Sequence, residues 1–139
     1  MNTMFDKLAK NLSPYILLIT RLATGYMFLL HGTAKFFEFP ISMTGGNGSI
    51  PLLSLMGVGG VIEIVGGLLI AIGLFTRPTA FVVAGMSAVA YFGFHAPSGM
   101  FNPISNGGEA AALFCMVFLL LWLTGAGKLS LDAKLFQHS

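Results

Sequence analysis

Residues 15–35 of the chain read YILLITRLATGYMFLLHGTAK, and this apolar stretch decides the fold class. A helix rises about 1.5 Å per residue, so some 20 residues cross the roughly 30 Å of hydrocarbon in a bilayer. The stretch has that length, and only Arg21 and Lys35 in it carry a full charge. It therefore predicts a transmembrane helix with one arginine well inside the membrane.

The composition of all 139 residues agrees with a membrane protein. Hydrophobic residues make up 55% of the chain and charged residues 9%, against roughly 25% charged residues in an ordinary soluble domain. These values exclude a disordered chain, a disulfide scaffold and almost any soluble enzyme. The net charge of +2 comes without a basic run, so nucleic acid is not an expected partner. Cys115 is the one cysteine, which leaves no CxxC pair for redox chemistry.

Three further apolar stretches follow, at about residues 52–75, 79–94 and 109–124. Pro14, Pro51 and Pro78 stand just before the first three spans. Proline lacks a backbone N–H, which costs nothing in a first turn, so each proline predicts a helix start. No repeat or linker divides the chain, and we expect one domain over residues 1–139. The predicted fold is all-α, an integral membrane four-helix bundle in up-down-up-down order.

The distribution of cations predicts the orientation of this bundle. Five cations fall on one side of the spans, and Lys35 alone falls on the other. By the positive-inside rule, both termini are expected in the cytoplasm. A cleaved signal peptide is the alternative for the N-terminus, but Arg21 interrupts the apolar run and the run is too long for one. The five cations on the predicted cytoplasmic side are Lys7, Lys10, Arg77, Lys128 and Lys134.

Arg21 and Glu63 are the charged residues that we expect deepest in the membrane. An ionisable side chain costs a few kcal/mol there, so each is a candidate functional residue. Glycines flank Glu63 at helical spacing and allow a neighbouring helix to come close. Counted from the expected helix ends, the two residues differ in depth by about 9 Å, within reach of two extended side chains. We therefore predict an Arg21–Glu63 ion pair, whose role is either to fix helix register or to pass protons.

A second group of polar residues is expected near the outer surface. His31 and Lys35 lie one turn apart, and His95 ends the third span. Asn106 and Glu109 lead into the fourth span, where capping alone would also explain them. No HxxH or HExxH spacing is present, so no metal site is predicted. The candidate residues for binding a ligand or handling protons are His31, Lys35, Glu63, His95, Asn106 and Glu109.

The order of these residues resembles the DoxX family of small bacterial four-helix membrane proteins. The resemblance covers almost the whole chain, although each motif is only a glycine beside a charged residue. The residues that carry it are Arg21, His31-Gly32, Lys35, Glu63, Gly66-Gly67, Gly73, Thr76-Arg77 and Asn106-Gly107-Gly108-Glu109.

The resemblance implies a multi-pass protein of the bacterial inner membrane. The family takes its name from a membrane subunit of a quinone-linked oxidoreductase acting on thiosulfate. It therefore implies a quinone-interacting or non-catalytic subunit that works beside an oxidoreductase partner in the lipid bilayer. A quinone is the expected ligand, and no covalently bound cofactor is expected.

Two other functions stay open, as does the question of whether the chain is itself an enzyme. One is a structural or assembly partner without activity of its own. The other is a small-molecule permease, in which Glu63 would be the coupling carboxylate. A homo-oligomer is compatible with each of these functions, and the sequence identifies no catalytic residue.

Overall fold

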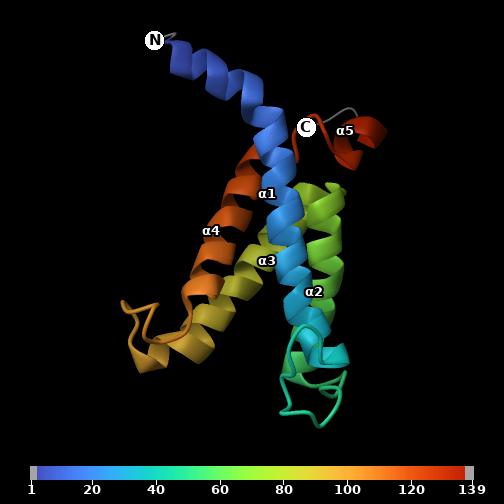
Figure 1. Cartoon of the computed structure of the whole chain (residues 1–139), viewed down its shortest axis with the longest axis vertical. Helices are drawn as coiled ribbons and strands as arrows, with labels where there is room; N and C mark the ends of the chain where they lie inside the picture. The colour runs from blue at the N-terminus through green and yellow to red at the C-terminus, as the bar shows by residue number, and fades with distance from the viewer. Residues whose placement is uncertain (1–2, 137–139) are drawn as a thin grey trace.

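The computed structural model describes residues 3–136, and all the regular elements in this range are helical (Figure 1). Three helical stretches are long and apolar enough to cross a membrane, namely Met4–Phe37, Leu55–Ile72 and Thr76–Ser98, and a fourth apolar helix is shorter. The all-α class is confirmed. The elements are α1 (Met4–Phe37), α2 (Leu55–Ile72), α3 (Thr76–Ala90), the π-helical turn η1 (Tyr91–His95), the 3₁₀ turn η2 (Ala96–Ser98), α4 (Glu109–Thr124) and α5 (Leu131–Phe136).

Side-chain caps set several helix starts, and the prediction that Pro14 marks a helix start is wrong for that reason. Thr3 and Asp6 form a reciprocal capping box that begins α1 ten residues before Pro14, which lies inside the helix. Pro78 is the third residue of α3, where it still costs no hydrogen bond. Ser54 caps α2 after Pro51, so there the proline does precede the helix. The predicted bounds of the fourth span, 109–124, match α4.

The four long helices form two closely packed pairs, α1 with α2 and α3 with α4 (Figure 1). The pairs meet through a core that includes Phe28, Ile70, Val83 and Phe118, and the rings of Phe28 and Phe118 pack edge to face. In Figure 1 the pairs diverge from this core toward the two long loops at the lower end. Residues of both pairs near that end line a common cavity.

Glycines fix how α1 and α2 lie against each other. A Cβ added to Gly25 would lie 2.5 Å from the carbonyl oxygen of Gly67, and one added to Gly32 would lie 2.5 Å from that of Gly60. Real Cβ atoms do not come so close to backbone, so the two helices touch where only glycine fits. These two contacts set the antiparallel register of the pair.

This register shows that the predicted Arg21–Glu63 ion pair is wrong. It brings Arg21 level with the C-terminal end of α2, where the guanidinium donates to the carbonyl oxygens of Ala71 (3.3 Å) and Leu129. Glu63 lies eight residues before Ala71 along α2, which corresponds to about 12 Å. The carboxylate of Glu63 pairs with Lys35 instead. Depth counted from assumed helix ends missed this, because the glycine contacts and not the ends determine which residues face each other.

The two long loops lie at one end of the molecule, and the tight α2–α3 turn lies at the other end with α5 (Figure 1). Asp132 of α5 accepts hydrogen bonds from the backbone N–H groups of Phe75 (2.7 Å) and Thr76 (2.9 Å), so α5 caps the start of α3. The side of the membrane on which each end lies stays a prediction from the cation distribution.

Candidate functional site

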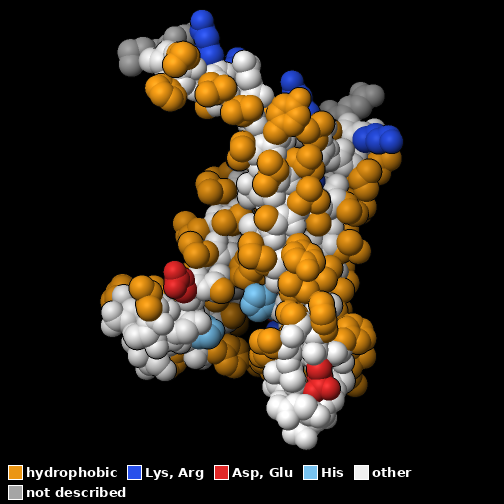
Figure 2. Space-filling model, viewed as in Figure 1, with side chains coloured by type: hydrophobic (Ala, Val, Ile, Leu, Met, Phe, Trp, Pro, Cys, Tyr) orange, Lys and Arg blue, Asp and Glu red, His pale blue; other side chains and the backbone are white. Residues whose placement is uncertain are grey.

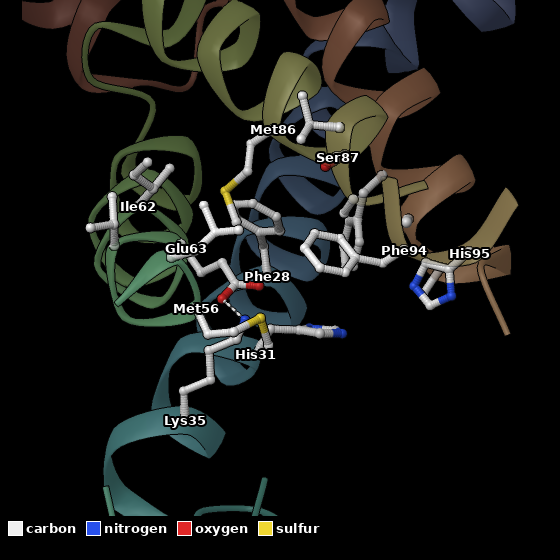
Figure 3. Close-up of a pocket in the computed structure, with 18 of the residues that line it drawn as sticks. Phe28, His31, Lys35, Met56, Ile62, Glu63, Met86, Ser87, Phe94 and His95 are labelled. Carbon is white, nitrogen blue, oxygen red and sulfur yellow. Dashed lines mark hydrogen bonds and ion pairs between the residues drawn. The ribbon is translucent and has the colours of Figure 1, made fainter. Parts of the chain in front are cut away.

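A cavity of about 530 Å³ lies where the two helix pairs diverge (Figure 3). Its lining comes from all four long helices and from both long loops. The volume falls within the roughly 300–1,000 Å³ that is typical of small-molecule sites. Most of the lining is apolar, and the polar side chains in it are His31, Lys35, Glu63, Ser87 and His95.

The ion pair of Lys35 and Glu63 forms the most polar part of the cavity wall. The ammonium group of Lys35 donates to Oε1 of Glu63, and the two side chains are only 9% and 7% exposed. In Figure 3 the dashed line joins the two side chains across the α1–α2 contact, directly beside Phe28 and Met56. The pair places a cation and a carboxylate in the wall without adding net charge to the cavity.

His31 lies one turn before Lys35 and lines the same cavity. Its Nδ1 atom is 2.8 Å from the carbonyl oxygen of Met27, and its ring packs edge-on against Phe114. A carbonyl oxygen can only accept a hydrogen bond, so Nδ1 carries the proton of the neutral imidazole. The other nitrogen, Nε2, is then an acceptor that can take a proton from a ligand.

His95 lies on the opposite side of the cavity, at the end of the π-helical turn η1. Its Nδ1 atom is 3.1 Å from the carbonyl oxygen of Asn106, which fixes the same tautomer as in His31. π-Helical turns inside longer helices are often associated with functional sites. In Figure 3, Phe94 and His95 face Glu63 and Phe28 across the cavity.

Asn106 does not line the cavity. Its side chain fixes the conformation of the loop before α4, and its own backbone carbonyl is the partner of His95. Its amide nitrogen donates to the hydroxyl of Tyr91 and to the carbonyl of Gly99, and its Oδ1 atom accepts from the N–H of Gly108. Glu109 is exposed in the first turn of α4 and lies outside the cavity lining. The structure thus brings four of the six candidates to one cavity, while Asn106 supports that cavity and Glu109 stands apart from it.

Sequence reasoning did not single out several residues of the cavity. Met56 and Met86 line it from α2 and α3 (Figure 3). Methionine fills irregular apolar gaps and its sulfur packs well against aromatic rings. The equal spacing of Gly25–Gly32 and Gly60–Gly67 is a sequence signal for the antiparallel register of the two helices. In this register Glu63 is offset by about six residues, or about 9 Å, from the level of Lys35, which two long side chains can bridge. Within residues 3–136, no three His, Cys, Asp or Glu side chains are placed to hold a metal ion.

Comparisons with known proteins agree with the membrane character of the chain. The family model described as DoxX matches residues 16–96. An uncharacterized protein of Haemophilus influenzae is 52% identical over 126 residues, which cover 89% of this chain and 93% of that protein. "Inner membrane protein YphA" of Escherichia coli is 31% identical, with 87% of this chain and 91% of that protein covered. "Putative oxidoreductase CatD" of Bacillus subtilis is 33% identical, with 86% and 87% covered.

No solved structure matches the chain. The inner-membrane relatives and the apolar helices together identify a multi-pass protein of the bacterial inner membrane.

Proposed function

The chain belongs to the DoxX family, and from this premise we propose that its cavity binds the head group of a quinone for a membrane oxidoreductase system. The observation that carries the proposal is the cavity itself, which has apolar walls and a few convergent polar groups. A core without such a space would instead have favoured a purely structural protein.

The walls suit a flat, lipid-soluble ring. Phe28, Phe94 and Phe114 offer aromatic faces and edges, and Met56 and Met86 offer polarizable sulfur atoms. A ring placed among them buries its faces against apolar atoms, which favours binding by roughly 25 cal/mol per Å² of apolar surface.

The polar groups suit the oxygens at the two ends of a quinone ring. The ammonium of Lys35 can donate to a quinone carbonyl while Glu63 holds its position. Nε2 of His31 and Nε2 of His95 are acceptors, which suits the hydroxyl groups of the reduced quinol. The chain would thus bind both redox forms, while the electrons pass to or from a partner protein.

One relative lends this proposal some support. The name of the Bacillus subtilis relative, "Putative oxidoreductase CatD", assigns oxidoreductase activity to that protein. The alternatives of an assembly partner and of a permease remain predictions from the sequence, and the binding experiment below separates the first of them from ligand binding.

The test is a binding measurement with a short-chain ubiquinone on the full chain in detergent micelles, by isothermal titration calorimetry. Ala111 lines the cavity, so Ala111→Phe fills part of it and is expected to weaken binding at least tenfold. Leu113→Phe is the matched control, because Leu113 is 59% exposed on α4 and does not line the cavity. It is expected to leave the affinity unchanged.

His31→Leu tests the polar contact. One lost hydrogen bond is worth about 0.5–1.5 kcal/mol, so a loss of about two- to twelvefold in affinity is expected. His31 is exposed, so the substitution should leave the fold intact. Absence of binding to the unaltered protein, or equal affinities in the Ala111→Phe and Leu113→Phe variants, would contradict the proposal and favour the assembly partner.

A further inference from the structure

Helix α1 is longer than a membrane requires. Its 34 residues extend about 51 Å at 1.5 Å per residue, whereas about 20 residues span the hydrocarbon. The register with α2 places the surplus at the N-terminal end, because Arg21 already lies beside the last turn of α2 at Ala71. About 16 residues at the start of α1, residues 4–19, therefore extend past the end of α2.

This N-terminal segment, residues 4–13, has two distinct faces. At about 100° per residue, Met4, Phe5, Leu8 and Leu12 fall within an arc of about 100°. Asp6 and Lys10 fall on the opposite side of the helix, Lys7 lies on the flank between the two faces, and Asn11 borders the apolar face beside Met4. Beyond Pro14 the helix is apolar on nearly all sides, as expected where it enters hydrocarbon.

The apolar face of the segment is exposed. Met4 and Phe5 are each 74% exposed, and Leu8 is 50% exposed. Figure 1 shows that the segment leaves the body of the molecule at an angle, and Pro14 lies where a missing N–H permits such a bend. Figure 2 shows hydrophobic side chains on the lower side of the segment, toward the membrane-spanning body, and Lys or Arg side chains on its upper side.

We propose that residues 4–13 lie in the membrane–water interface as an amphipathic anchor, with Lys7 and Lys10 bound to the head groups of anionic phospholipids. Lipid acyl chains then bury the apolar face of the segment, which no other part of the described chain covers. The charges at this end favour anionic lipid. Asp6 is engaged by the capping box of α1 and Asp132 caps α3, while both lysines are exposed. The anchor goes beyond the proposed function and does not depend on it.

The position of the segment can be measured with spin labels on the full chain in vesicles, in a Cys115→Ala background. Leu8→Cys and Lys10→Cys are a matched pair, because both residues are exposed and lie about 160° apart around the helix. An interfacial helix gives a label at position 8 that collides with oxygen in the hydrocarbon, and a label at position 10 that collides with a water-soluble nickel complex. A segment that projects into water gives nickel collisions at both positions and overturns the proposal.

The lipid preference is tested in vesicles of phosphatidylcholine alone and in vesicles with added phosphatidylglycerol. Each lysine near an anionic surface favours the bound segment about fivefold, so the anionic lipid is expected to deepen the label at position 8. The double substitution Lys7→Gln/Lys10→Gln should remove this response. A depth that does not depend on phosphatidylglycerol overturns the lipid assignment. Protection of both labels from both colliders, lost on dilution of the protein in the vesicles, would instead assign the face to a second copy of the chain.

Discussion

Breaking the ion pair of Lys35 and Glu63 should destabilise the protein far more than removing both charges together. The two side chains are 9% and 7% exposed, so either one alone would be a buried, uncompensated charge. Removing one partner of a buried pair typically costs about 3–5 kcal/mol. Because the pair borders a cavity and is not enclosed on every side, we expect the lower end of this range, about 3 kcal/mol, for Lys35→Met and for Glu63→Gln. That is about two orders of magnitude in the unfolding equilibrium.

The assay is equilibrium unfolding in mixed micelles of dodecyl maltoside and dodecyl sulfate, followed by far-ultraviolet circular dichroism. The two single variants and the double variant complete a double-mutant cycle. The double variant has no unpaired charge, so its loss should be about 1 kcal/mol, well below either single loss, which corresponds to a coupling of about 5 kcal/mol.

The same cycle with Arg21→Met in place of Lys35→Met is the control. The guanidinium of Arg21 binds backbone carbonyls and not Glu63, so the two substitutions should add to within about 0.5 kcal/mol. Additive effects of the Lys35 and Glu63 substitutions, or a strong coupling between Arg21 and Glu63, would refute the register of α1 and α2 described above.

Three further perturbations test other parts of the structure. Gly67→Ala should cost about 1–3 kcal/mol in the same unfolding assay, because its Cβ would lie 2.6 Å from a backbone carbonyl of α1, whereas Gly85→Ala meets open space and should not destabilise. Asp132→Ala should cost about 0.5–2 kcal/mol and speed hydrogen exchange at the first amides of α3, which it caps. The hydroxyl of Ser42 donates to Glu38 and lowers the pKa of that carboxyl. The ionised carboxylate therefore stabilises the loop at a pH above the pKa that Glu38 has in the unfolded chain. This stabilisation is lost as the pH falls through the pKa of Glu38 in the folded protein. Ser42→Ala should therefore raise the pKa of Glu38 toward its ordinary value in an NMR titration, and an unchanged titration would show that the hydrogen bond does not form.

The sequence predicted the membrane-crossing part of each helix well, but it predicted some of the helix ends poorly. The fourth span was placed at the bounds of α4, because Gly107 and Gly108 before it and Gly125 after it mark both ends locally. The start of α1 predicted from Pro14 lies eleven residues too late, because the capping box of Thr3 and Asp6 begins the helix at Met4. Proline in the first turn and proline inside a bent helix look the same in sequence.

The sequence predicted four of the residues that line the cavity, but it did not predict which of them pair with each other. His31, Lys35, Glu63 and His95 do line one cavity, because antiparallel helices bring these positions to one end of the molecule. The partner of Glu63 was wrong, since a shift in register exchanges one cation for another while leaving the hydropathy of both helices unchanged.

The sequence by itself determined that this chain is an all-helical membrane protein, because its long, continuous apolar stretches with few charges are typical of transmembrane helices, whose backbone hydrogen bonds are satisfied within each segment. The tertiary structure alone decided which charges meet and where the cavity opens. Both depend on contacts between helices far apart in the chain, where two glycines allow backbones to touch and the diverging pairs leave space that no local pattern records.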